Sequence, residues 1–215
     1  MMLKQTLLAF LIVLGCGFSE SIFGQKMDKI RLKNSSFEDD PSPSHTPKDW
    51  FDCGFAGESP PDVQPNGLFG VSQTAFHDST YVGMVVRDNN TWEGIGQKLK
   101  KSLRKNIKYS FSVYACQSEK YVSNSRITEK EINYNTPAVI RIWLGNEECE
   151  KKELVAQSDG INFKNWKKLD FTITPKNDYR YIVIEVYYIR VFKSVYNGNI
   201  LIDNASAIVP ILDKN

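Results

Sequence analysis

The chain has 215 residues, and its 27 Lys and Arg against 25 Asp and Glu give a formal charge of +2 at pH 7. Because this charge is small and the basic residues are scattered apart from residues 98–105, we expect no nucleic-acid partner. Twelve Phe, ten Tyr and four Trp argue against disorder, and the length suits one domain with a full hydrophobic core.

Residues 1–24 have the pattern of a secretory signal peptide. Lys4 precedes an apolar run over residues 6–15, which is too short to span a bilayer. We therefore predict cleavage near Gly24 and one mature domain over residues 25–215, exported to the periplasm, the cell surface or the medium. Residues 13–16 also resemble a bacterial lipobox, so an alternative mature form begins at a lipid-anchored Cys16. No second apolar run suggests a transmembrane segment.

Alternation of apolar and polar residues with period two dominates the rest of the chain, while helical periodicity is weak. The alternation assigns Phe111, Ile142 and Ile184, for example, to the buried side of their strands. Many strands joined by turns and long loops predict an all-β fold, a two-sheet antiparallel jelly-roll β-sandwich. The predicted inner strands cover residues 81–87, 95–99, 109–116, 138–144, 166–174 and 181–191.

The first and last predicted strands, residues 29–38 and 199–209, are expected to pair and so to close the sandwich. Their pairing would bring Glu38 near Asp203. Two carboxylates placed together need a proton or a cation between them, and calcium accepts carboxylates together with backbone carbonyls. We therefore predict a structural calcium ion held by Glu38 and Asp203. The alternative is a surface carboxylate at Glu38 and a turn-capping role for Asp203.

The predicted mature chain has an odd number of cysteines, Cys53, Cys116 and Cys149, so at most one internal disulfide can form. If residues 109–116 and 138–144 form an antiparallel hairpin, Cys116 and Cys149 lie at its opposite ends, too far apart to bond. The more plausible bridge joins Cys53 to Cys149, although all three thiols could be free.

A ligand-binding face is predicted from the positions that point away from the core. On three strands these are Tyr114, then Arg141 and Trp143, then Glu185 and Tyr187. Rings beside an acid and a cation suit sugars, whose C–H faces stack on aromatics while their hydroxyls hydrogen-bond to charged groups. In the alternative reading, loops cover the rings and Arg141 and Glu185 form an ion pair beneath them. Residues 117–137, with Tyr121, Arg126 and Tyr134, could form a lid over this face or one rim of it.

The residues that catalysis would need are scarce. The only histidines, His45 and His77, have no neighbouring His or Cys at metal-ligand spacing, and no nucleophile elbow or phosphate-binding glycine loop occurs. A glycoside hydrolase needs only two suitably spaced carboxylates, and Glu185 is the best single candidate, but no second acid clearly faces it. We therefore expect a binding protein and no enzyme.

Four short motifs resemble the galactose-binding-like jelly rolls, the superfamily that holds many carbohydrate-binding modules. They are Asn34-Ser-Ser-Phe-Glu38, Trp50, Tyr181-Ile-Val-Ile-Glu185 and Leu201-Ile-Asp-Asn-Ala-Ser206. In that family the acids of the opening and closing motifs commonly hold a structural calcium, which implies the same role for Glu38 and Asp203. This chain departs from the family in having Asp203-Asn204 where two acids are usual.

The stretch over residues 52–62 is similar to domains of exported surface proteins of Gram-negative bacteria, some of them attached to peptidoglycan-binding OmpA-like domains. The resemblance implies a bacterial, non-catalytic carbohydrate-binding module that binds a glycan on one sheet face or its rim loops. The alternative is a structural or adhesion protein of the cell envelope that binds a protein partner through the same surfaces.

Overall fold

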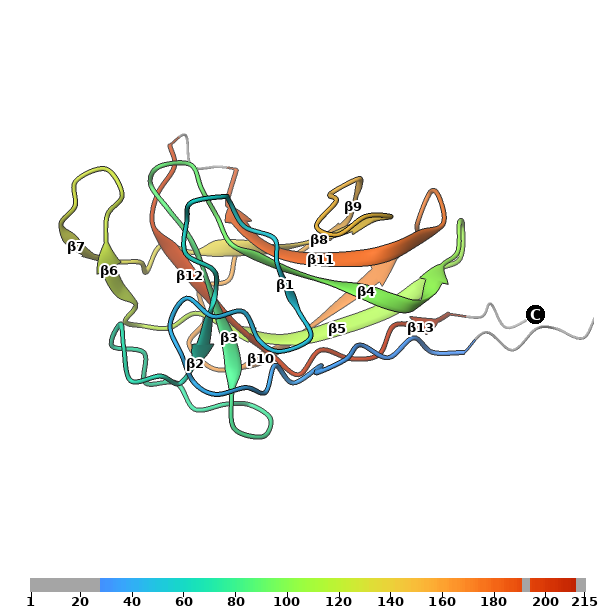
Figure 1. Cartoon of the computed structure of the whole chain (residues 1–215), viewed down its shortest axis with the longest axis horizontal. Coiled ribbons are helices and arrows are strands. Elements are labelled where there is room, and N and C mark those ends of the chain that lie inside the picture. Colours follow the sequence, from blue (N-terminus) through green and yellow to red (C-terminus); the bar gives the residue numbers. More distant parts are fainter. Residues whose placement is uncertain (1–27, 191–193, 212–215) are drawn as a thin grey trace, which may run out of the picture.

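The structure is a computed structural model that describes residues 28–190 and 194–211. Two antiparallel sheets pack face to face, and a small hairpin projects from one end (Figure 1). The first sheet, called the β11 sheet, has the order β1 (Phe51–Asp52), β4 (Gly94–Leu103), β11 (Tyr179–Tyr188), β8 (Ala138–Gly145) and β9 (Glu153–Gln157).

The second sheet, called the β5 sheet, lies opposite it (Figure 1). Its order is β10 (Lys167–Ile173), β5 (Tyr109–Cys116), β12 (Gly198–Asp203), β3 (Tyr81–Val86) and β2 (Asp62–Gln64), with β13 (Val209–Pro210) also paired to β5. The hairpin consists of β6 (Val122–Asn124) and β7 (Glu131–Asn133). The prediction of an all-β antiparallel sandwich is confirmed, and the described residues contain no helix able to span a membrane.

The core between the sheets follows the period-two alternation of the strands. Ile142 of β8 and Ile184 of β11 are paired across the β11 sheet and are fully buried, and Phe111 of β5 faces them from the other sheet. The predicted inward positions of these three strands are therefore correct. Strand β3 is buried along its whole length because loops cover its outer face, where Tyr81 and Val85 belong to a second apolar cluster.

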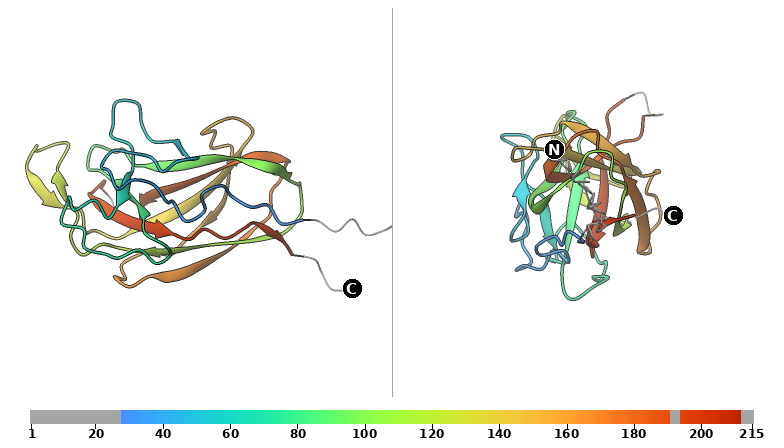
Figure 2. Two further views of the ribbon diagram at one scale, coloured as in Figure 1. Left: turned by 60° about the horizontal axis from the view of Figure 1, so that its bottom comes forward. Right: turned by 90° about the vertical axis from the view of Figure 1, so that its right-hand side faces the viewer.

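The predicted first strand is wrong. Residues 31–38 form no ladder, and the pairing of the chain ends is reduced to a bridge between Ile30 and Ile208 and a hydrogen bond from Ala205 N to the Ser35 carbonyl (Figure 2). The cause is Asn34, which has a φ of 40° and closes a turn with its side-chain amide. Its Oδ1 accepts from Glu38 N at 2.8 Å, and its Nδ2 donates to the Glu38 carbonyl at 2.9 Å.

Glu38 and Asp203 nevertheless contact the same segment, residues 76–80. Asp203 Oδ2 accepts the backbone N–H groups of Phe76 and His77 at 2.8 and 2.9 Å, and Glu38 accepts those of Ser79 and Thr80 at 3.2–3.3 Å. Burial raises the pKa of Asp203 to about 6 despite these bonds, and the nearby charge of Glu38 adds to the rise.

The predicted disulfide is confirmed, since Cys53 is bonded to Cys149. It joins the segment that follows β1 to the loop between β8 and β9. Cys116, the one free cysteine among the described residues, is fully buried, and burial raises the pKa of its thiol to about 12. Burial thus disfavours the thiolate, which is the nucleophilic form of cysteine.

Candidate functional site

The buried carboxylate of Glu185 lies at the centre of the outer face of the β11 sheet. Strand alternation turns Ile184 into the core and Glu185 outward, between its cross-strand partners Gly94 of β4 and Arg141 of β8. Although it points away from the core, Glu185 is only 1% exposed. A buried carboxylate requires donors or cations around it, and here the neighbouring side chains provide both.

Glu185 receives hydrogen bonds from two indole rings and ion pairs from two bases. Trp143 Nε1 donates to Oε1 at 2.7 Å, and Trp92 Nε1 donates to Oε2 at 2.9 Å. Lys151 Nζ lies 2.6 Å from Oε2, and Arg141 Nη1 lies 3.9 Å from Oε1. Both oxygens are therefore used within the protein, and the two indoles are held by their polar edges.

Two glycines and the disulfide make room for this arrangement. A Cβ on Gly94 would come within 3.0 Å of Glu185 Cβ, and one on Gly96 would come within 2.7 Å of Cys53 Sγ. The disulfide thus lies directly on the sheet. Because Cys149 is two residues before Lys151, the bridge fixes the loop that brings the lysine onto Glu185.

Four half-exposed rings form what we call the aromatic platform: Phe55, Trp92, Trp143 and Tyr187. The ring of Trp92 contacts Phe55 edge-on at 4.7 Å between centroids and Tyr187 edge-on at 4.8 Å. The guanidinium of Arg141 lies 3.3 Å from the Tyr187 ring centroid. The rings are thus fixed by contacts on their edges and inner faces while part of each remains in solvent.

The structure brings together four of the five residues that were predicted to form the ligand face. These four are Arg141, Trp143, Glu185 and Tyr187. Arg141 and Glu185 are buried beneath the rings as an ion pair, as in the alternative interpretation, and cannot face a ligand. The prediction that Tyr114 joins this face is wrong. Tyr114 belongs to the β5 sheet, where its ring stacks on that of Phe76 at 3.6 Å between centroids. Strand alternation shows which way a residue points along its own strand, but not which sheet the strand joins.

The sequence prediction missed Trp92, Phe55 and Lys151, because none of them lies within a regular strand. Trp92 precedes β4, and Phe55 and Lys151 lie in loops, so the period-two pattern gave no information about them. A signal existed in Gly94 and Gly96, since glycines in a strand often mark a close approach by another group.

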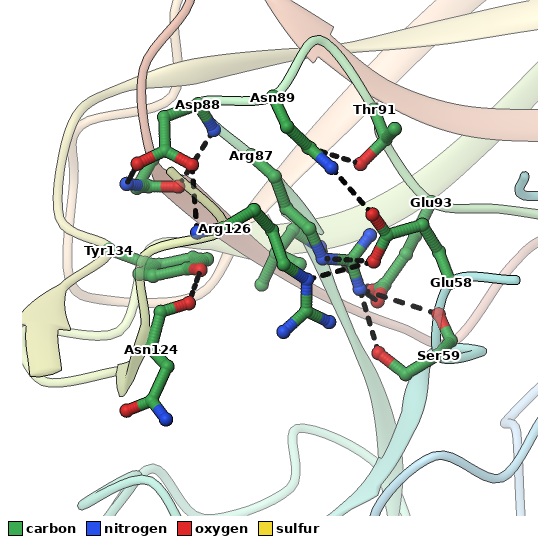
Figure 3. Close-up of polar contacts among 12 residues, drawn as sticks. Glu58, Ser59, Arg87, Asp88, Asn89, Thr91, Glu93, Asn124, Arg126 and Tyr134 are labelled. Carbon is green, nitrogen blue, oxygen red and sulfur yellow. Dashed lines mark hydrogen bonds and ion pairs between the residues drawn. The ribbon is translucent and has the colours of Figure 1, made fainter. Parts of the chain in front are cut away.

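The segment over residues 117–137 also lies elsewhere than predicted. It packs on the β5 sheet, where Tyr121 and Tyr134 belong to the apolar cluster that covers β3, and so it is no lid over the platform. Its hairpin is held by Asp88, which accepts from Ser125 Oγ at 2.6 Å and from the backbone N–H of Arg126 at 3.0 Å (Figure 3).

The described histidines and acids form neither a catalytic triad nor a metal site. Ser36 Oγ and Asp78 Oδ2 both contact Nδ1 of His77, at 2.7 and 3.0 Å, so they do not flank the imidazole as a nucleophile and an orienting acid would. Among residues 28–190 and 194–211, no group of three or more His, Cys, Asp and Glu side chains could hold a metal ion.

Several solved structures are similar to this chain in fold. The structure is similar to an arabinose-bound GH51 α-L-arabinofuranosidase, at 11% identity and a TM-score of 0.55, with 85% of this chain covered but only 26% of that enzyme. It also resembles the CBM22-1 xylan-binding domain of Xyn10C from Paenibacillus barcinonensis, at 13% identity and a TM-score of 0.48, covering 88% of this chain and 99% of that domain.

A third similar structure is the K3 cleaved adhesin domain of Lys-gingipain from Porphyromonas gingivalis, at 8% identity and a TM-score of 0.48, covering 84% of this chain and 97% of that domain. No protein-family model matches the sequence, and a search of curated proteins finds no relative. Likeness at these identities is a likeness of fold alone.

Glu185→Gln should destabilise the domain strongly. The amide keeps the shape but turns N–H groups toward an indole or Lys151 and leaves buried Arg141 without its counter-charge, at a cost of about 3 kcal/mol or more. Urea denaturation would measure the loss, with Glu148→Gln, a change of an exposed loop acid, as the control. Equal stability of Glu185→Gln and the wild type would contradict the central role of this carboxylate.

Proposed function

We propose that this chain is an exported, non-catalytic carbohydrate-binding module whose ligand stacks on the aromatic platform. The observation that carries the proposal is the fixing of Trp92 and Trp143 through Glu185. Rings that are already immobile lose little side-chain entropy when a sugar stacks on them. The apolar C–H faces of a sugar complement such rings, which form weak but specific contacts.

The burial of Glu185 supports binding over hydrolysis. A glycosidase needs carboxyl groups that reach the scissile bond. Glu185 is 1% exposed, and its oxygens are occupied by Trp92, Trp143 and Lys151, so it has no free path to a substrate. Glu185 therefore serves to position the indole rings of Trp92 and Trp143.

Export is part of the proposal, although the signal peptide over residues 1–24 and the alternative lipid anchor at Cys16 lie outside the described residues. Intact-mass measurement of the protein after expression in a Gram-negative host is expected to show loss of the first 24 residues. An added lipid mass at Cys16 would select the anchored form, and an uncleaved cytoplasmic chain would overturn export.

The rival function is an adhesion protein of the cell envelope that uses the same face for a protein partner. A glycan array and a pull-down from envelope extract, run on the same mature domain, separate the two. Glycan binding at micromolar to millimolar affinity supports the carbohydrate-binding function. A blank array with a captured partner supports the rival.

Phe55→Ala should weaken glycan binding about two- to tenfold, the loss expected for one aromatic stacking contact, with little change in melting temperature. Phe55 is 37% exposed, and its ring makes an edge-on contact with that of Trp92. Phe76→Ala is a matched control, because Phe76 is similarly exposed, at 41%, but stacks on Tyr114 in the other sheet.

Trp143→Ala should reduce binding further and also lower the melting temperature, because Glu185 loses a donor. Binding by titration calorimetry and melting by circular dichroism would be measured on all three variants. Unchanged affinity in both Phe55→Ala and Trp143→Ala would reject the platform as the binding surface.

A structural calcium ion at Glu38 and Asp203 remains a proposal. Two carboxylates near one segment fit a hard cation, but the backbone N–H groups of residues 76–80 already bind them, so an ion would have to replace or share these contacts. Calcium should raise the free energy of unfolding at pH 7.5, by about 2.7 kcal/mol at a hundredfold excess over Kd.

This calcium effect should shrink at pH 5, because the pKa of Asp203 is about 6 and protons then compete for its carboxylate. Thermal unfolding with calcium and with a chelator measures both effects, with Asp203→Asn as the variant expected to lose them. Identical melting in calcium and chelator at pH 7.5 would show that the amide contacts suffice.

A further inference from the structure

A small cavity lies between the β5 sheet and the β6–β7 hairpin, in the region shown in Figure 3. Its volume is about 30 Å³. A water molecule needs roughly 10–15 Å³ of such space, so about two water-sized groups fit. The polar residues that line it are Ser44, Ser59, Asp62, Arg87, Glu93, Tyr121, Ser123, Arg126 and Tyr134.

Arg87 lines this cavity and carries an unused donor. The side chain is buried, with 2% exposure, and its Nη2 donates to Glu93 and to the Ser59 hydroxyl at 2.9 Å (Figure 3). Its Nη1 has no partner, which makes it one of three such buried side-chain nitrogens among the described residues. A guanidinium stays charged when buried, so an unpaired N–H group here is costly and favours an acceptor that enters the cavity.

The acids around Arg87 decide what kind of acceptor fits. Burial raises the pKa of Asp62 and, against the opposing charge of Arg87, that of Glu93. Glu58 behaves differently: burial opposes its ionisation, but hydrogen bonds from Asn89 and Arg126 and the charges of Arg87 and Arg126 lower its pKa. A ligand with its own negative charge would therefore enter beside carboxyl groups that already disfavour charge.

A hydroxyl group fits these neighbours better than an anion. It can accept from Arg87 Nη1 and donate its own proton to a carboxylate or a serine oxygen. Two adjacent hydroxyls on a sugar ring occupy about the space of two water molecules, which is the room available. The mixture of donors and acceptors in the lining matches such a diol.

We infer that this cavity binds the vicinal hydroxyls of a neutral sugar, as a second subsite on the opposite sheet from the aromatic platform. The inference rests on the proposed carbohydrate-binding function for its ligand class. The hairpin wall is held in place by Asp88, which is bound by Ser125, Arg126 and Asn197. Although partial burial opposes it, these hydrogen bonds lower the pKa of Asp88, so the wall stays fastened at neutral pH.

The test uses Ser123→Val, which fills the cavity from the half-exposed strand β6 without touching the Arg87 and Glu93 pair. Valine is also favourable in a strand, so the hairpin is expected to fold. Neutral methyl glycosides and the matching methyl uronates are titrated into the folded, isotope-labelled mature domain. Amide chemical shifts of residues 59, 87 and 123 report the cavity, and those of residues 92, 143 and 187 report the platform.

We expect neutral glycosides to shift the cavity amides in the wild type and in Trp143→Ala, with affinity about tenfold or more weaker in Ser123→Val, as loss of a hydrogen bond to a charged group predicts. Shifts at the platform alone, or undiminished cavity shifts in Ser123→Val, would overturn the inference and leave the proposed function intact. Tighter binding of uronates than of neutral glycosides would overturn the diol assignment. The absence of any shift at either site with every glycoside would count against both proposals.

Discussion

Buried carboxylates that need donors determine where the loops of this protein lie. Water cannot reach Glu185 or Asp203, so each must be satisfied from within the protein. Glu185 is satisfied by two indoles and a lysine from outside its own strand, and Asp203 by backbone amides of residues 76–80. In both cases a strand residue holds a loop against the outer face of its sheet. These contacts shape the two outer faces of the sandwich.

Most of the fold could be predicted because its signals are local. The inward positions of β5, β8 and β11 join one core cluster as the sequence pattern indicates, since a strand must turn every second side chain to the same side. Burial itself does not alternate along β8 and β11, because many of their outward positions are covered as well. The disulfide was predicted correctly, but from a premise that the structure contradicts. Strands β5 and β8 lie in different sheets and form no hairpin, so the assumed separation of Cys116 from Cys149 along one hairpin does not exist.

The parts that could not be predicted depend on contacts between distant segments. Tyr114 has the same alternation as Trp143, and only the order of strands within the sheets separates them. Residues 31–38 have a strand-like composition, but the Asn34 side chain closes a turn that competes with the ladder. Trp92 and Lys151 belong to the site because Glu185 and the disulfide bring them there, and neither contact has a sequence period.

The two faces of the sandwich are built on shared segments. Trp92 donates to Glu185 on the β11 sheet, while the next residue, Glu93, accepts from Val85 N and from Arg87 on the side of the β5 sheet. Residues 55–59 repeat this division, because Phe55 contacts Trp92 and Ser59 accepts from Arg87. The two sites are therefore linked through neighbouring residues of the same two segments. The burial of Arg87 and Glu93 is costly unless both are paired. Because Glu93 follows Trp92 directly, their ion pair anchors the segment that carries one ring of the platform.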